Sequence, residues 1–561
     1  MNVNQTVIQS PKPFIKIKRL DEGSSSKTVS FYTDEQKIAI AIWSGKYGNG
    51  WEHRKALVMK EYPTCNFEEV KKIVQNSKSA SDIKKTEKTY EIPTYLSTTH
   101  DVADFDFFDG NRVLQSYQFS LSKNDVTGSF SLTFFPESAD GIYDLLEILD
   151  IVEIYENKRE YEKFSFSLFK KDIPIDRSKI PVFIGIIKSK KYVSQVTDGG
   201  IVRRLQVSGI SAAGLVSQFY LNLDTTAMCL TKQFAESESF SNKLTTQLST
   251  EKKVDAIIKA IWESFCNLAE QVGTVAIKSL IENTMGKNIF DCDTSTFNYP
   301  LSNPFKGEQT QDFYSLIDGV IPQPLYEKFA YMDFDSGKMR IKIRQVPFRK
   351  KGDDDTAKDE NGIAVNWENL RSTEILSYTV KNVDLTQSDN EVYTVFFSYL
   401  RGYPVNTDKL MRIIAMEEQD VYAPNSMIKY NPKKYQIYGY RPLIATFNGY
   451  NITDTEETSD INKNLTKCNE RLQEWFGDLE RMLSGSITIA MTYDNTPIMP
   501  GEKVKFLGGE FYVEGISHSW TYGQGGDINL SVSRGGEYQD GSFTSLKDFT
   551  KRIKLLETKK G

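Results

Sequence analysis

Apolar and polar residues alternate in two separate parts of the chain, which is the pattern of strands with one buried and one exposed face. In the first part the alternation covers Tyr117–Leu121 and returns in Phe130–Phe134 after a polar turn. In the second part, strand-like segments run from Glu374 to Leu400 and from Ser486 to Gly536. Because closure removes the exposed edges of a sheet, we expect two closed or nearly closed antiparallel barrels, at residues 101–230 and 367–540.

Other parts of the chain have the 3.6-residue period of amphipathic helices. A small module at 35–76 has two helical stretches around the glycine-rich loop Gly45–Gly50. Residues 231–366 are expected to be helical or mixed, with an apolar stripe at 254–268. The clearest helix, at 459–485, has Ser459 suited to its start and Gly485 to its end, and we expect it to pack on the second barrel.

The remaining segments lack such a period. Residues 1–34 are interpreted as an extended arm, 77–100 as a polar linker and 541–561 as a C-terminal tail. The sequence thus predicts an α+β multidomain protein with two antiparallel β-barrel, tube-like domains, helical insertions and a small N-terminal helical module. No sequence repeat is visible between the two β regions, so their duplication is inferred from the strand pattern alone.

Composition narrows the functional classes. The net charge of −6 and the pI of about 5.6 provide no global positive field for binding nucleic acid. No apolar run reaches the roughly 18 residues of a membrane span, and the first residues lack the apolar core of a secretory signal. We therefore expect a protein without a membrane span that is made in a cytoplasm.

The residue types that carry catalysis and metal binding are few. The five cysteines are widely spaced and odd in number, and the three histidines form no HxxxH pair. The acidic loop Lys351–Gly362 lacks the donor pattern of an EF-hand. We predict no catalytic residues, no metal and no cofactor. Paired carboxylates for glycoside cleavage are a spatial arrangement, so a cell-wall-degrading enzyme stays as an alternative.

Three segments resemble the baseplate hub, or tail hub, proteins of long-tailed phages and related contractile particles. The first, at 324–348, ends in a strand with Arg344, Pro347 and Phe348. The second, at 377–400, is a strand pair with Ser388 and Asp389 in its turn. The third, at 500–538, contains in order Pro500–Gly501, Phe511–Glu514, His518–Trp520 and Arg534–Gly536. The resemblance extends in this order over residues 101–540.

This resemblance implies a mechanical function. In this family three chains, each with two tube-like barrels, form a pseudo-sixfold ring that joins a sixfold tail tube to a central threefold spike. The expected partners are two further copies of the chain, the tail tube protein and the spike, and contacts with tape-measure and baseplate wedge proteins stay open. The implied location is the tail baseplate of a virion assembled in a bacterial cytoplasm. The hub of a bacterial secretion or extracellular injection machine is a second alternative.

The module at 35–76 resembles the small cell-wall-binding repeat of some phage endolysins, which implies a contact with peptidoglycan. In this chain Tyr47 and Trp51 are candidates for stacking on a sugar, and Asn49 for hydrogen bonding. Lys46 and Arg54 are candidates for binding a carboxylate of a stem peptide. The alternative interpretation is structural: the glycines allow a tight turn between helices, and Tyr47 fills a small core.

Overall fold

The computed structural model describes most of the chain. The described residues are 13–106, 113–135, 139–156, 180–197, 200–218, 220–222, 275–293, 310–321, 323–348, 363–400, 428–447, 458–492, 497–539 and 542–546, with single positions or short runs between 255 and 266 and between 548 and 554. The acidic loop 351–362 and much of the apolar stripe at 254–268 lie outside them. The described chain divides into a helical module, Asp21–Leu96, and a main body that holds the rest.

The helical module has its own apolar core, made by residues of all three of its helices together with Tyr47 and Ile83. Helix α1 begins at a capping box, in which Thr33 and Gln36 exchange side-chain to backbone hydrogen bonds. The side chain of Asn66 caps α3 in a similar way. The helices are α1 (Asp34–Trp43), α2 (Trp51–Glu61), α3 (Phe67–Asn76) and the 3-10 helix η1 (Ala80–Asp82).

Two long strands occupy the segments for which the sequence indicated an arm and a linker. They are β1 (Phe14–Phe31) and β2 (Thr86–Asp106), which pair with each other, and β1 also pairs antiparallel to β5 (Ile151–Tyr155). Ile15 and Ile17 of β1 are fully buried, so the start of this strand belongs to the main core. The helical module is therefore inserted between two paired strands.

The first β unit of the main body contains five antiparallel strands in the order β3-β4-β7-β6-β5. The alternation in the sequence is confirmed as burial, since Tyr117, Phe119 and Leu121 are buried together with Phe130 and Phe134. The segment directly after β7 is the 3-10 helix η4. The elements are β3 (Leu114–Ser122), β4 (Asp125–Phe134), α4 (Ala139–Leu145), β6 (Phe183–Thr197), β7 (Gly200–Ser211) and η4 (Ala212–Gln218).

The second β unit has five strands in the corresponding order, β14-β18-β21-β20-β19, and the two short strands β13 and β22 pair with β19 and β21. Among the strands that the structure describes in this part of the sheet, β13 and β19 form the one parallel pair. The strands are β13 (Ser372–Glu374), β14 (Val380–Thr386), β18 (Leu483–Ala490), β19 (Lys503–Phe506), β20 (Gly509–Thr521), β21 (Gly525–Gln539) and β22 (Ser542–Thr544), with the 3-10 helix η5 at Ser377–Thr379.

A small subdomain separates β14 from β18 in the sequence. Its sheet has the order β16-β15-β17, so the segment at 391–400 belongs to it and not to the second β unit. The predicted helix 459–485 is shorter: α12 ends at Phe476, and Gly485 lies in β18, where a Cβ would be 2.1 Å from the carbonyl oxygen of Asp384. The elements are β15 (Val395–Leu400), β16 (Lys429–Tyr430), α11 (Pro432–Tyr438), β17 (Pro442–Phe447), α12 (Thr458–Phe476) and η7 (Leu479–Arg481).

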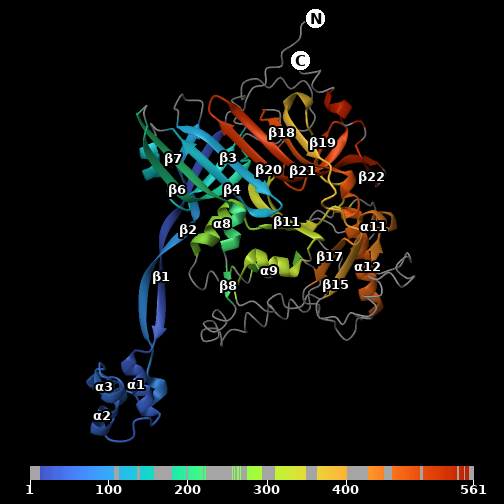
Figure 1. The fold of residues 1–561 in the computed structure, drawn as a ribbon. Coiled ribbons are helices and arrows are strands. Elements are labelled where there is room, and N and C mark those ends of the chain that lie inside the picture. Colours follow the sequence, from blue (N-terminus) through green and yellow to red (C-terminus); the bar gives the residue numbers. More distant parts are fainter. Residues whose placement is uncertain are drawn as a thin grey trace, which may run out of the picture. The chain divides into compact units, whose positions relative to one another are not determined.

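The two β units are not separate barrels. Strand β20 of the second unit pairs antiparallel with β3 of the first, from Gly515 opposite Ser122 to Thr521 opposite Ser116. Figure 1 shows the blue and green strands of the first unit continuing into the red strands of the second at this junction. Among the described strands no pairing closes either unit, so the expectation of two barrels is corrected to one continuous, mainly antiparallel sheet.

The segments between the two units pack against this sheet. A three-stranded sheet in the order β11-β12-β9 contributes Phe290, Met339 and Ile341 to the core of the main body. Its strand at 338–345 confirms the strand expected at the end of 324–348. The elements are β8 (Tyr220–Asn222), α8 (Val275–Met285), β9 (Phe290–Cys292), β10 (Thr310–Asp312), α9 (Phe313–Val320), β11 (Tyr326–Asp333) and β12 (Lys338–Gln345). None of the described helices is long and apolar enough to cross a membrane.

The fold predicts a sharp difference between two glycines. A Cβ on Gly209 of β7 would lie 1.9 Å from the carbonyl oxygen of Ile186 and 2.6 Å from the ring of Phe130. We expect Gly209→Ala to lower the free energy of unfolding by about 1–3 kcal/mol, because the overpacked core has to shift. In α4, a Cβ on Gly141 meets no atom within 4 Å, so Gly141→Ala is the matched control and is expected to be neutral or stabilising.

Urea unfolding of the two variants beside the parent chain measures this difference. Equal midpoints for Gly209→Ala and the parent chain would contradict the packing described for β4, β6 and β7.

Candidate functional site

The loop between α1 and α2 is shaped by three glycines with positive φ, at Gly45, Gly48 and Gly50. This left-handed backbone is readily adopted by glycine and strained for other residues. It turns the chain sharply enough for α2 to begin at Trp51, directly after the loop. The glycine pattern in the sequence therefore indicated the turn correctly.

The loop does not present Tyr47 as a stacking surface. Tyr47 is buried in the core of the helical module, where its hydroxyl donates to Oε2 of Glu61 at 2.9 Å. Burial raises the pKa of the Tyr47 hydroxyl. Lys46 forms an exposed ion pair with Oε1 of the same carboxylate, at 2.6 Å. Lys46 and Tyr47, both predicted to bind the cell wall, therefore contact Glu61 of the same module. Tyr47 fills the small core of the module, as the alternative interpretation of the sequence expected.

Trp51 and Arg54 do come together beside the loop. The guanidinium of Arg54 lies 5.2 Å from the Trp51 ring and its Nε donates to the carbonyl oxygen of Gly48 at 2.8 Å. Asn49 is exposed in the same loop. On α3, Lys71 places its ammonium 5.7 Å from the Trp51 ring, a contact for which the local sequence carried no signal. The result is a half-buried aromatic ring flanked by two cations.

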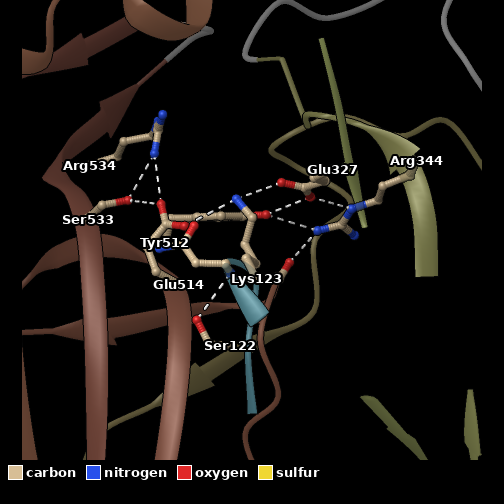
Figure 2. A network of polar contacts seen from close by, with 10 residues as sticks. Ser122, Lys123, Glu327, Arg344, Tyr512, Glu514, Ser533 and Arg534 are labelled. Atoms are coloured by element: carbon tan, nitrogen blue, oxygen red, sulfur yellow. Dashed lines mark hydrogen bonds and ion pairs between the residues drawn. The ribbon is translucent and has the colours of Figure 1, made fainter. Parts of the chain in front are cut away.

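A second cluster, at the junction of the β units, is a network of buried charges that we call the junction network (Figure 2). Its centre is Lys123, in the turn between β3 and β4. The Lys123 ammonium lies 2.7 Å from Oε2 of Glu327 and 3.1 Å from Oε2 of Glu514. Its backbone N–H donates to the carbonyl oxygen of Glu514 at 2.9 Å. One side chain of the first unit thereby contacts β11 and β20.

Arg344 of β12 forms the second part of the junction network. Its Nε donates to Oε1 of Glu327 at 2.8 Å, and its Nη2 donates to the hydroxyl of Tyr512 at 3.2 Å and to the carbonyl oxygen of Gly501. The Tyr512 hydroxyl donates in turn to Oε1 of Glu327 at 2.6 Å. Both oxygens of the Glu327 carboxylate are therefore engaged, one by Lys123 and one by Arg344 and Tyr512.

Arg534 of β21 forms the third part. Its Nη1 lies 2.9 Å from Oε1 of Glu514, which also accepts a hydrogen bond from Ser533. The guanidinium stacks 4.1 Å from the ring of Trp475 on α12. Arg534 has a positive φ of 55°, an uncommon conformation for a side chain of this size, and these contacts hold it there. The network thus extends to the small subdomain through Trp475.

The charges of the junction network stabilise one another. Burial by itself raises the pKa of Glu327, but the cations of Lys123 and Arg344 outweigh it and hold the pKa at about 2. Burial also acts against the ionised form of Glu514, and Lys123 and Arg534 nevertheless keep its pKa below the usual range. Removal of one member would leave its partners charged and buried, which is more costly than losing the whole set.

The junction network is suited to holding segments together, not to acid–base chemistry, because its carboxylates are already neutralised by cations. Glu327 and Arg344 lie in the segment at 324–348 that carries the family resemblance, and Tyr512, Glu514 and Arg534 lie in the segment at 500–538. No sequence pattern indicated that these side chains come together. Among the described residues, no group of histidines, cysteines or acids is arranged to hold a metal ion.

No protein-family model and no curated protein sequence matches the chain. It is similar to solved structures of three tail-related proteins. The tail protein from Neisseria meningitidis MC58 is 12% identical, covers 78% of this chain and 93% of its own, and has a TM-score of 0.38. The 43 kDa tail protein of prophage MuSo2 from Shewanella oneidensis is also 12% identical, with 78% and 94% covered and a TM-score of 0.33.

The third structure is the E. coli c3393 protein, described as a component of the type VI secretion system with structural similarity to the T4 bacteriophage tail proteins gp27 and gp5. It is 10% identical, with 77% and 76% of the two chains covered and a TM-score of 0.30.

The junction network predicts an acid-sensitive contribution to stability. The folded pKa of Glu327, about 2, lies below its ordinary value of 4.5, so its stabilising contribution is complete above pH 4.5 and is lost as the pH falls toward 2. We expect Glu327→Gln to be less stable than the parent chain at pH 7, and the difference to shrink between pH 4.5 and 2. Asp34→Asn, at an exposed carboxylate, is the control.

Urea unfolding at a series of pH values measures both effects. A Glu327→Gln variant as stable as the parent chain at pH 7, with the same pH dependence, would contradict the role assigned to this carboxylate.

Proposed function

We propose that this chain is the structural hub of a phage tail or phage tail-like particle. Three copies form a pseudo-sixfold ring, and this ring joins the sixfold tail tube to the central threefold spike. The proposal rests on the resemblance of residues 101–540 to hub proteins and on one structural observation, the continuous sheet that two β units of the same strand order form within one chain. A ring of three such chains contains six β units, which matches a sixfold tube.

The shape of the sheet supports a ring in preference to a closed domain. The described sheet begins at β14 and continues through β20 and β3 to the strands of the first unit. Unpaired edges of this kind bind further strands, and natural proteins use such edges for association. A cyclic assembly uses one heterologous interface repeatedly, so the unpaired strand edge of each copy is paired with the next copy.

The junction network supports the load-transmitting role that a hub has. It connects both β units and the β11–β12 hairpin through ion pairs and charged hydrogen bonds, and it contacts α12 through the Arg534 guanidinium on the Trp475 ring. Such bonds are stronger than neutral ones and fix the geometry of their partners. The two β units are therefore held as one rigid piece of the ring.

The alternatives from the sequence differ in what supports them. For a cell-wall-degrading enzyme, the buried carboxylate of Glu327 and the half-buried carboxylate of Glu514 provide no support, since both are paired with cations. A hub of a secretion or extracellular injection machine needs the same geometry as a phage hub, so this alternative stays beside the proposal. Contacts with tape-measure and wedge proteins are part of the same proposal.

The mass of the isolated full-length chain, measured by multi-angle light scattering over a range of concentrations, tests the ring. We expect a particle with three times the mass of the chain, and binding of this particle to tube assembled from the tail tube protein of the same particle. A chain that stays monomeric at every concentration and does not bind the tube would rule out the proposed function.

A second function is proposed for the helical module, the binding of peptidoglycan. The observation that favours it is the Trp51 ring between Arg54 and Lys71, since aromatic rings stack on sugars and these cations suit the carboxylates of stem peptides. Asn49 belongs to this surface. Tyr47 and Lys46 support it indirectly, through their contacts with Glu61.

Co-sedimentation of the full-length chain with purified sacculi tests this second function. We expect the double variant Asn49→Ala/Arg54→Gln to bind at least several-fold less, because it loses one amide and one cation beside Trp51. Lys37→Gln, at an exposed position on α1, is the matched control and should bind like the parent chain. Equal binding of all three chains would rule out this surface as the wall-binding site.

A further inference from the structure

The two β units agree in register as well as in strand order. In the first unit Leu132 of β4 lies opposite Val207 of β7, and in the second unit Ile487 of β18 lies opposite Leu530 of β21. With these two pairs taken as equivalent, the neighbouring pairs coincide as well. Residues Ser131–Phe134 correspond to Ser486–Ile489, and Leu205–Ser208 correspond to Ile528–Ser531.

Two of the register shifts in the first unit also have an equivalent in the second. In both units the edge ladder, β3–β4 or β14–β18, skips one residue near its start, and the long hairpin, β6–β7 or β20–β21, skips one residue near its middle. A bulge is a specific local feature and not a general property of sheets. The equivalent bulges are Leu114/Ser116 with Val380/Asn382, and Ile187/Ser189 with Val513/Gly515.

Strand β20 has two neighbours on its outer edge. Its first part, Gly509–Tyr512, pairs with β19, and its second part, Gly515–Thr521, pairs with β3 of the other unit. In the first unit, β6 repeats only half of this arrangement. Phe183–Ile186 pairs with β5, the equivalent of β19, whereas no described strand pairs with the outer edge of β6 from Ser189 onward. The equivalent of β3 is missing there.

The strand equivalent to β3 is β14, and β14 has an outer edge without a described partner. Among the described strands of its own chain it pairs with β18 alone, and this pair is the equivalent of β3 with β4. We propose that β14 of a second copy of this chain pairs antiparallel with the outer edge of β6, and so repeats between copies the junction that β3 and β20 form within one copy. This inference rests on the proposed ring and names its interface.

The pairing of β3 with β20 within one chain also predicts the register between β6 and β14 of two copies. The equivalences assign Ser189 to the position of Gly515 and Ser388 to that of Ser122. The strands then continue antiparallel from this pair. The expected neighbours are Lys190 with Gln387, Lys191 with Thr386, Tyr192 with Leu385, Val193 with Asp384, Ser194 with Val383, and Gln195 with Asn382.

An ion pair supports this register independently of the strand ladders. Within the chain, Lys123 and Glu514 join β3 to β20. The residues at the equivalent positions are Asp389 and Lys188, which again have opposite charges, with the signs exchanged between the two strands. Asp389 is exposed, and Nζ of Lys188 donates to Oε1 of Gln218 at 2.8 Å, whereas none of the ion pairs among the described residues includes Lys188. Lys188 is half-buried, and burial lowers its pKa, so a carboxylate from a second copy would stabilise its charge.

Disulfide cross-linking of the full-length chain tests the register. The double variants Ser194→Cys/Val383→Cys and Val193→Cys/Asp384→Cys place cysteines at two adjacent expected pairs, so that one of them has the close spacing of a non-hydrogen-bonded pair. After mild oxidation we expect a covalent trimer on a non-reducing gel for at least one variant. The parent chain, with its own cysteines, should remain uncross-linked.

The slipped variant Ser194→Cys/Asp384→Cys is the matched control, since a shift of one residue turns one cysteine to the opposite face of the sheet. A trimer by mass with no link in either expected pair, or with equal linking in the slipped variant, would overturn this interface and leave the hub in place. A chain that is monomeric throughout would instead count against the proposed function itself.

Charge exchange gives a second readout of the same interface. We expect Lys188→Asp to raise the concentration needed for assembly at least tenfold, because it places two carboxylates together. The variant Lys188→Asp/Asp389→Lys should restore assembly, because it re-creates the orientation of the pair in the internal junction. Failure of the double variant to recover any assembly, with its thermal unfolding unchanged, would contradict the proposed contact.

Discussion

The burial of one lysine is the constraint on which the main body depends. An ammonium group is costly to remove from water, and Lys123, with only 12% of its side chain exposed, loses most of its contact with water at the point where three distant parts of the chain meet. Its charge is tolerated only when Glu327 and Glu514 are both in place. Those carboxylates in turn require Arg344 and Arg534. The segments are therefore stable together and strained when apart, which makes the junction a cooperative unit and not a hinge.

Much of the local structure could be predicted because it depends on nearest neighbours along the chain. The alternation of apolar and polar residues in Tyr117–Phe134 indicated strands with one buried face, and the glycines of the loop at 45–50 indicated a turn. The apolar spacing after Ser459 indicated a helix but not its end, because Leu479 in η7 and Met482 directly after it continue the same spacing beyond Phe476. Gly485 looked like a helix terminus although a neighbouring strand requires it.

What could not be predicted depends on pairing across long distances. The alternation of a strand says which face is buried but not which strand lies beside it, so two barrels and one continuous sheet share the same sequence pattern. Polar residues at the start of β2 looked like a linker because a two-stranded ribbon needs no apolar face. Part of the candidate wall-binding surface could be predicted, because Trp51 and Arg54 follow the loop closely in sequence. Lys71 could not, because it reaches the Trp51 ring only through the packing of α3.

The two β units differ most at one equivalent turn. Between β3 and β4 the chain needs only Lys123 and Asn124, whereas between β14 and β18 it inserts residues 387–482 with the small subdomain. In the proposed ring, six nearly identical sheets would therefore carry this extra mass at every second position. The strands of the six β units would present a surface with sixfold symmetry, and the three copies of the insertion 387–482 would present a surface with threefold symmetry. The change of symmetry that a tail requires between its tube and its tip would then follow from the length of a single hairpin turn.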